Sequence, residues 1–166
     1  LYQEKAVGAA APMVGILKRI IVVDLQKDGQ RAPFVMINPE ITWKSDETQL
    51  FEEGSICFPG ISAEVIRSQS ITVRYLAEGG DQKNMDANGY LATVLQHEID
   101  YLDGVIYLDY LSTVKRKMLL TIKEMKKFNI SPDRLETKSL QQTNFLSAFW
   151  QNIVNYEHSH DKKLLK

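Results

Sequence analysis

The segment 95–104, LQHEIDYLDG, has two adjacent side chains suited to chemistry on a bound metal ion. Helix positions four residues apart share a face, so ligands at 97 and 101 would meet one ion, and a glutamate beside the first would face its bound water as a base. His97 and Glu98 meet this need, but position 101 is Tyr101, whose neutral phenol is a poor ligand. The alternative is a structural histidine buried in an apolar helix.

The elements that must position these residues follow from the apolar periodicity. The segments predicted as strands are 18–25, 33–43 (interrupted by Asn-Pro), 50–60 (strand or loop) and 62–78 (one or two strands). A turn-rich connection is expected at 79–89, then a buried helix from about Tyr90 to Tyr101, which is apolar on most faces. A second, basic helix is predicted over 112–129 with Ser112 as its N-cap. Strands first and helices late favour an α+β fold.

Bulk composition excludes several classes of protein. The chain has 166 residues, 44% apolar and 25% charged, which fits one soluble globular domain. Its net charge of -1 predicts neither DNA nor a membrane as a partner. Cys57 is the single cysteine, so no internal disulfide can form. The first residues lack the pattern of a signal peptide, and a cytoplasmic location, or alternatively an organelle matrix, is expected.

Three segments in order resemble the motifs of the peptide deformylase family. AVGAAAPM (6–13) stands at the place of Gly-x-Gly-apolar-Ala-Ala-x-Gln, and EGSICFPG (53–60) at the place of Glu-Gly-Cys-Leu-Ser. QHEIDYLDG (96–104) stands at the place of Gln-His-Glu-x-Asp-His-Leu-x-Gly. Order, spacing and flanking segments agree over roughly residues 1–120.

The resemblance implies a fold and an activity. The fold would be α+β, with antiparallel β-sheets around a central helix that carries His97 and Glu98. The activity would be removal of the formyl group from the N-terminal methionine of new proteins, with one divalent metal, commonly Fe²⁺ or Zn²⁺. It also implies a deformylase-like domain at 1–130, with its N-terminal part missing, followed by a C-terminal tail at 131–166 of unknown role.

Carried over by position, the family's three metal ligands fall on Ser55, His97 and Tyr101. Of these, His97 alone is a good ligand, because a serine hydroxyl offers neither the charge nor the softness of a thiolate. Three strong ligands are usual for a catalytic zinc, so no cofactor, or only a weakly bound metal, is expected here. The alternative is that Cys57 supplies a displaced thiolate, since residues two apart on a strand share a face.

Other family roles also map onto this chain. Glu98 takes the place of the catalytic base, and the backbone N–H of Ile56 that of an oxyanion donor. Met13 stands where the family's glutamine donates to the oxyanion, and it has no donor. The motif matches further imply that Gly8, Glu53 and Gly54 contribute to substrate binding.

These departures predict a deformylase homologue with lost or strongly reduced metal-dependent hydrolysis that still binds formyl-methionyl peptides or nascent-chain N-termini. One alternative is an active peptide deformylase with an altered metal site. Another is a serine hydrolase built from Ser55, His97 and Asp100. The basic helix 112–129 suggests contact with the ribosome; its alternative interpretation is a solvated amphipathic face.

Overall fold

The computed structural model describes residues 1–4 and 6–127. Residues Leu1–Leu120 form one compact unit, and Thr121 begins a second. The strands are β1 Gly8–Ala10, β2 Ile20–Val23, β3 Phe34–Lys44, β4 Thr48–Gly54, β5 Ser62–Ser68, β6 Ser70–Leu76 and β7 Gln82–Asn88. The helices are α1 Gly89–Leu102 and α2 Thr113–Lys127, with short 3-10 helices η1 Tyr2–Glu4, η2 Ala11–Val14, η3 Lys27–Gly29 and η4 Tyr107–Tyr110.

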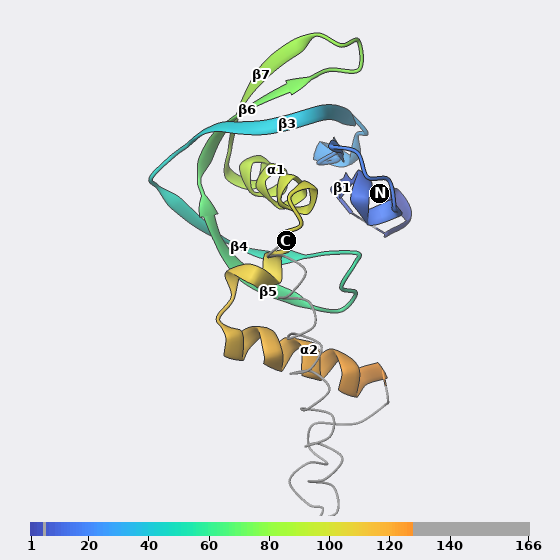
Figure 1. The fold of residues 1–166 in the computed structure, drawn as a ribbon, viewed down its shortest axis with the longest axis vertical. Coiled ribbons are helices and arrows are strands. Elements are labelled where there is room, and N and C mark those ends of the chain that lie inside the picture. Colours follow the sequence, from blue (N-terminus) through green and yellow to red (C-terminus); the bar gives the residue numbers. More distant parts are fainter. Residues whose placement is uncertain (5, 128–166) are drawn as a thin grey trace, which may run out of the picture. The chain divides into compact units, whose positions relative to one another are not determined.

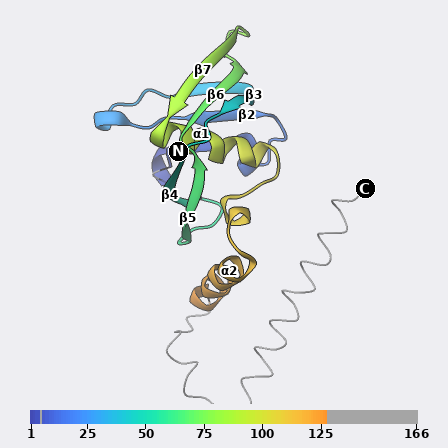
Figure 2. The same ribbon diagram turned by 90° about the vertical axis from the view of Figure 1, so that its left-hand side faces the viewer.

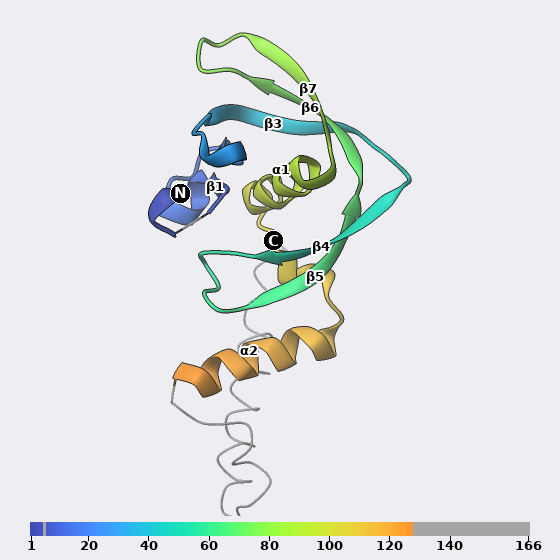
Figure 3. The same cartoon turned by 180° about the vertical axis from the view of Figure 1, so that it is seen from behind.

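Two antiparallel sheets surround α1. The larger has the strand order β1-β2-β3-β6-β7, and the smaller pairs β4 with β5. Within the first unit, α1 lies between the two sheets (Figures 1 and 3), and the view turned by 90° again shows it between β7 and the β4–β5 pair (Figure 2). This arrangement confirms the α+β fold with antiparallel sheets around a central helix.

The interior is built on α1, whose residues Ala92 to Ile99 are all buried. The apolar members of this run pack with inward residues of the larger sheet, which include Ile21, Val23, Met36, Ile71 and Val73. A second cluster forms where β5 meets η4, around Val65, Tyr107 and Leu108. A histidine and a glutamate in the centre of such a helix are therefore held in fixed positions.

The chain passes between the sheets along two paired segments. The backbone N–H of Ser45 donates to the carbonyl of Ser70, and that of Gln69 donates to Glu47. These bonds lie where β3 leads into β4 and where β5 leads into β6. They bring the inner face of the β4–β5 pair under α1, which positions the acidic end of β4 against the helix.

The structure corrects the expected layout at several points. Residues 82–88, expected within a turn-rich connection, form β7, which pairs with β6 along its whole length. Strand β3 continues through Asn38-Pro39 with a shift of register, and Asn38 has a positive φ of 50°. The segment 50–60 is a strand only as far as Gly54, after which the chain turns.

The basic helix is present as α2, Thr113–Lys127. Ser112 caps it as expected, because its hydroxyl accepts a bond from the backbone N–H of Lys115. Residues 128–129 of the predicted helix and the predicted tail 131–166 lie outside the described residues. Within the described part of the chain, no helix has the length and apolar character needed to cross a membrane.

Candidate functional site

A cavity of about 370 Å³ lies against the middle of α1. Its walls come from β1 and η2 on one side and from the end of β4 with the following turn on the other. The lining residues are Ala6, Val7, Gly8, Met13, Glu52, Glu53, Gly54, Ser55, Ile56, Pro59, Tyr90, Thr93, Val94, His97 and Glu98. Residues from all three sequence segments that carry the resemblance therefore meet in one cavity.

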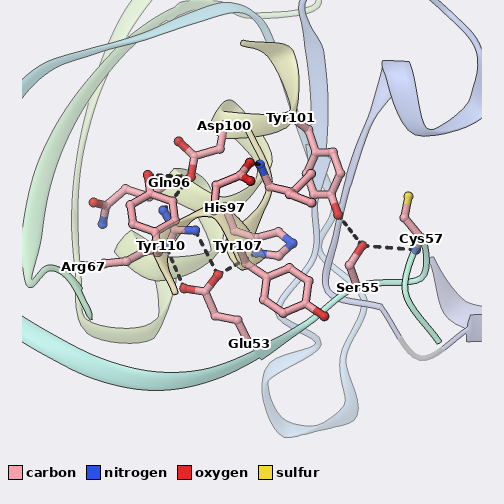
Figure 4. A network of polar contacts seen from close by, with 12 residues as sticks. Glu53, Ser55, Cys57, Arg67, Gln96, His97, Asp100, Tyr101, Tyr107 and Tyr110 are labelled. Carbon is pink, nitrogen blue, oxygen red and sulfur yellow. Dashed lines mark hydrogen bonds and ion pairs between the residues drawn. The ribbon is translucent and has the colours of Figure 1, made fainter. Parts of the chain in front are cut away.

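The ring of His97 is oriented by the carboxylate of Glu53. Its Nδ1 lies 2.7 Å from Oε2 of Glu53, and its ring stacks on that of Tyr107 at 5.8 Å (Figure 4). A neutral histidine that donates from Nδ1 keeps its lone pair on Nε2, so the Glu53 contact fixes both the tautomer and the direction of the ring. His97 is thus oriented to use Nε2 in the cavity.

Glu53 belongs to a buried ion network. Arg67 donates from Nε and Nη2 to the two oxygens of Glu53, and its side chain is 2% exposed. Burial alone would raise the pKa of Glu53, but the hydrogen bonds from His97 and Arg67 outweigh it, and the pKa lies below its ordinary value. Glu53 is therefore a fixed anion that serves as a hydrogen-bond acceptor.

The same arginine connects the network back to α1. Its Nη1 donates to Asp100 at 2.7 Å, and the hydroxyl of Tyr110 donates to the same carboxylate oxygen at 2.9 Å. The Arg67 guanidinium also lies 4.6 Å from the centre of the Tyr110 ring. These contacts join β5, α1 and η4 around one cation, which stabilises the orientation of the histidine.

Glu98 is the least satisfied polar group of the site. It is 4% exposed, and its Oε2 has no hydrogen-bond partner among the described residues. Burial raises the pKa of Glu98 to about 7; His97 opposes this shift and Glu53 adds to it. Gly8 makes room for this carboxylate, since a Cβ on Gly8 would lie 2.8 Å from Cδ of Glu98.

At the two other ligand positions, the hydroxyls bond to each other. Tyr101 donates to Oγ of Ser55 at 2.6 Å, and the backbone N–H of Cys57 donates to the same oxygen at 3.2 Å (Figure 4). Burial raises the pKa of Tyr101 further above its ordinary value, so the phenol keeps its proton. Ser55 and Tyr101 thus join the end of β4 to α1 through a neutral hydrogen bond.

The premise for Cys57 as a displaced ligand was wrong. Ser55 follows the last residue of β4, and Cys57 lies in the turn after it, so the two do not share a strand face. Cys57 is exposed. The backbone N–H of Cys57 donates to Oγ of Ser55, and the Cys57 thiol lies close enough to Tyr101 to raise the pKa of that phenol.

A serine hydrolase triad has no support in these contacts. The hydroxyl of Ser55 is engaged by Tyr101 and by the backbone of Cys57. Nδ1 of His97 faces Glu53, while Asp100 binds Arg67 and Tyr110.

Sequence reasoning missed Arg67, Tyr107 and Tyr110. A signal for Arg67 was present, because it follows Ala63 and Val65 in the alternation of inward residues along β5. A charged residue at an inward strand position needs a buried partner. Tyr107 and Tyr110 lie in η4, where the short 3-10 turn gives no periodicity to read.

Comparisons with known proteins bear on this architecture. The family model for polypeptide deformylase matches residues 1–117. The chain belongs to the peptide deformylase family.

Its relatives extend this assignment. A protein of Rickettsia conorii named peptide deformylase-like is 50% identical over 135 residues, covering 81% of this chain and 73% of the relative. The peptide deformylase of Bartonella tribocorum is 45% identical over 123 residues, covering 72% and 69%. Among solved structures, a peptide deformylase from Legionella pneumophila has a TM-score of 0.70 at 34% identity, covering 84% of this chain and 78% of the other. The peptide deformylase of Ehrlichia chaffeensis in complex with actinonin gives 0.70 at 37%, covering 76% of both.

The peptide deformylase family is metal-dependent, and the residues present here do not fit a tightly bound ion. At the ligand positions, one imidazole meets two neutral hydroxyls that are hydrogen-bonded to each other. Both oxygens of Glu53 are used by Arg67 and His97. The described residues contain no group of three or more His, Cys, Asp or Glu side chains arranged to hold an ion. A serine and a protonated phenol bring no negative charge to a divalent cation.

Proposed function

We propose that this member of the peptide deformylase family binds peptide N-termini in its cavity, while metal-dependent hydrolysis is lost or strongly reduced. The observation that carries the proposal is the 2.6 Å hydrogen bond from Tyr101 to Ser55. The side chains at the two other expected ligand positions form a hydrogen bond with each other. The imidazole of His97 is then a single strong ligand, which is too few to bind a catalytic cation.

Two further features reduce hydrolysis. A general base in the place of Glu98 can deprotonate water at neutral pH only if the pKa of that water is lowered. Without a bound metal the pKa of water stays far above neutral. Met13 lines the cavity at the position of an oxyanion donor and has no N–H to offer from its side chain. Losing one such donor costs about 10²- to 10³-fold in rate. The backbone N–H of Ile56, which also lines the cavity, is the proposed remaining donor.

Peptide binding has separate support. Gly8, Glu53 and Gly54, the residues expected to contact substrate, all line the cavity. Strand β4 pairs with β5 alone among the described strands, so its other edge presents backbone groups to which an extended peptide can bond. The apolar lining, which includes Val7, Met13, Tyr90 and Val94, suits an apolar first side chain such as methionine.

The second candidate is an active peptide deformylase that holds its metal in an altered way. It is supported by the relatives that carry the name peptide deformylase at 45% identity and less, by the retained Glu98, and by the Glu53 carboxylate that orients His97. This candidate requires a ligand set other than the one inherited by position.

Formate release separates the two candidates. We expect protein purified without air or chelators to hold less than a stoichiometric amount of metal and to release no formate from formyl-Met-Ala-Ser. The same protein should bind that peptide in calorimetry. Stoichiometric metal with multiple-turnover formate release would establish the active enzyme and refute the proposed loss. Folded protein that binds no methionyl peptide would refute the binding function.

The partner and its location follow from this function. A nascent-chain N-terminus is the proposed partner, and the cytoplasm is the proposed location. Helix α2 is the proposed contact with the ribosome. Its basic residues include Lys115, Arg116, Lys117 and Lys123. Arg116 forms an ion pair with Asp109 at 2.6 Å, so part of this charge is already neutralised. Charge reversal at Lys115 should weaken co-sedimentation with ribosomes; unchanged co-sedimentation would favour a solvated face.

A further inference from the structure

The charged side chains that line the cavity are predominantly acidic. Glu52, Glu53 and Glu98 contribute carboxylates, and none of the described lining residues is lysine or arginine. Glu53 forms an ion pair with Arg67 and a hydrogen bond with His97. Glu52 is exposed and accepts a hydrogen bond from Ser62. Of these three carboxylates, Glu98 is buried, and its Oε2 has no hydrogen-bond partner among the described residues.

The environment of Glu98 calls for a hydrogen-bond donor. Its Oε2 is buried and has no partner among the residues that the structure describes, and the side chain is 4% exposed. A buried carboxylate without a partner is costly, and such groups are normally satisfied by protein, water or a ligand. The close approach of Gly8 and the burial of α1 hold the carboxylate in place. A hydrogen-bond donor on a molecule bound in the cavity, which Glu98 helps to line, would satisfy this carboxylate.

We propose that the cavity recognises peptides by a free, positively charged N-terminal amine, in preference to a formylated one. The inference rests on the proposed function and names its ligand class. An ammonium brings three N–H donors and a positive charge to a site whose uncompensated group is a carboxylate. A formylated nitrogen brings one N–H and no charge. The ammonium of the peptide thus brings a positive charge to the cavity. Ser55 and Tyr101, which bond to each other, do not bring one by binding a metal ion.

The remainder of the cavity restricts the first side chain. Apolar residues from several segments line it beside the acidic group: Val7, Met13, Ile56, Tyr90 and Val94. They favour an apolar first side chain. The ligand class is therefore a peptide that begins with an unformylated methionine or a residue of similar shape, which is a peptide after deformylation.

Calorimetry on the full chain, treated with chelator, tests this ligand class. Three peptides of one sequence, Met-Ala-Ser-amide, carry a free amine, an N-formyl or an N-acetyl group; the amide removes the C-terminal charge. We expect the free amine to bind at least about tenfold more tightly than the formyl peptide, as a charged hydrogen bond warrants. A fourth peptide with a hydroxyl in place of the amine should bind as weakly as the formyl form.

Matched variants assign the preference to one carboxylate. Glu98→Gln should lower affinity for the free amine at least about tenfold and leave the formyl peptide within about twofold. Glu64→Gln, which alters an exposed carboxylate on β5 outside the cavity, should change neither. The four wild-type titrations do not depend on whether Glu98→Gln folds.

The outcomes distinguish the inference from the proposed function. Equal or tighter binding of the formyl peptide overturns the inference and leaves peptide binding standing. A preference for the amine that persists in folded Glu98→Gln overturns the role of this carboxylate. Binding of none of the peptides by folded protein overturns the function and the inference together.

Discussion

The hydroxyl pair Tyr101–Ser55 is the smallest unit on which the properties of the site depend. It is a direct 2.6 Å bond between α1 and the end of β4, at the two positions where the family resemblance implies metal ligands. The bond joins these two elements without any ion.

A double-mutant cycle measures this bond. Tyr101→Phe and Ser55→Ala each remove one hydroxyl, and both changes together remove the pair. We expect a coupling energy of about 0.5–1.5 kcal/mol in chemical denaturation, the usual net value of a protein hydrogen bond. Additive effects of the two changes would mean that the hydroxyls do not bond in solution.

Glu98 gives the protein a pH-dependent stability. Burial raises its pKa to about 7 from 4.5, so the folded protein holds this proton to higher pH than the unfolded chain does. The stability from this proton is complete below the unfolded pKa and is lost as the pH rises through about 7. The side chain in Glu98→Gln is neutral at every pH. The free energy of unfolding of this variant, minus that of wild type, should therefore rise by about 3 kcal/mol from pH 4 to pH 8.

Denaturation of both proteins at each pH provides the measurement. Any fixed cost of burying the amide that Glu98→Gln introduces cancels, because only the change with pH is compared. Glu64→Gln, at an exposed position, serves as the control and should show no such trend. A difference between wild type and Glu98→Gln that is constant across pH would show that Glu98 titrates normally.

Among the elements, β5 supplies Arg67, a residue that the sequence motifs did not reveal. Arg67 links Glu53 on β4 to Asp100 on α1, and its side chain is 2% exposed. Removing one partner of a buried ion pair leaves an uncompensated charge, which typically costs about 3–5 kcal/mol. The orientation of His97 depends on Glu53 and therefore on this cation.

Arg67→Met should accordingly destabilise the protein by about 3–5 kcal/mol in urea denaturation. Arg74→Met, which breaks the exposed pair with Glu40, is the matched control and should cost no more than about 1 kcal/mol. Adding Glu53→Gln to Arg67→Met should recover part of the loss, because the unpaired carboxylate is gone. A double variant less stable than Arg67→Met would contradict this account of the network.

The elements differ in how well the sequence predicts them. Helix α1 and the strands β2, β3 and β5 follow from apolar patterns, because most of their inward residues are apolar. β7 could not be found in this way, since QKNMDAN is an edge strand that buries only Ala87 completely. Its position depends on pairing with β6, a long-range contact that no local pattern encodes.

The site shows the same division. The residues of the cavity came from three motifs whose order and spacing carry the family resemblance. The bond between Tyr101 and Ser55, and the network around Arg67, arise from side chains far apart in sequence that the fold brings within hydrogen-bond distance. The residue types predict weak metal ligands at positions 55 and 101, but only the structure reveals that these two side chains bond to each other.

At the scale of the whole molecule, the fold is that of the peptide deformylase family, and the proposed change concerns only the donor set of the site. The structure of this chain matches a Legionella pneumophila deformylase at a TM-score of 0.70. Burial of α1 between two sheets depends on apolar residues outside the ligand positions. Folding should therefore be independent of metal, and the site should accept one again when its donors are restored.

The triple variant Met13→Gln, Ser55→Cys, Tyr101→His tests this separation of fold from chemistry. It supplies a thiolate, a second imidazole and an amide donor around His97, whose Nδ1 is already held by Glu53. Chelator should leave the Tm of wild type unchanged, whereas Zn²⁺ at 100 times its Kd should stabilise the triple variant by about 2.7 kcal/mol. The single variant Met13→Gln, which restores no ligand, is the control and should not respond to Zn²⁺. A triple variant that folds but binds no metal would show that the geometry of the site has drifted as well as its donors.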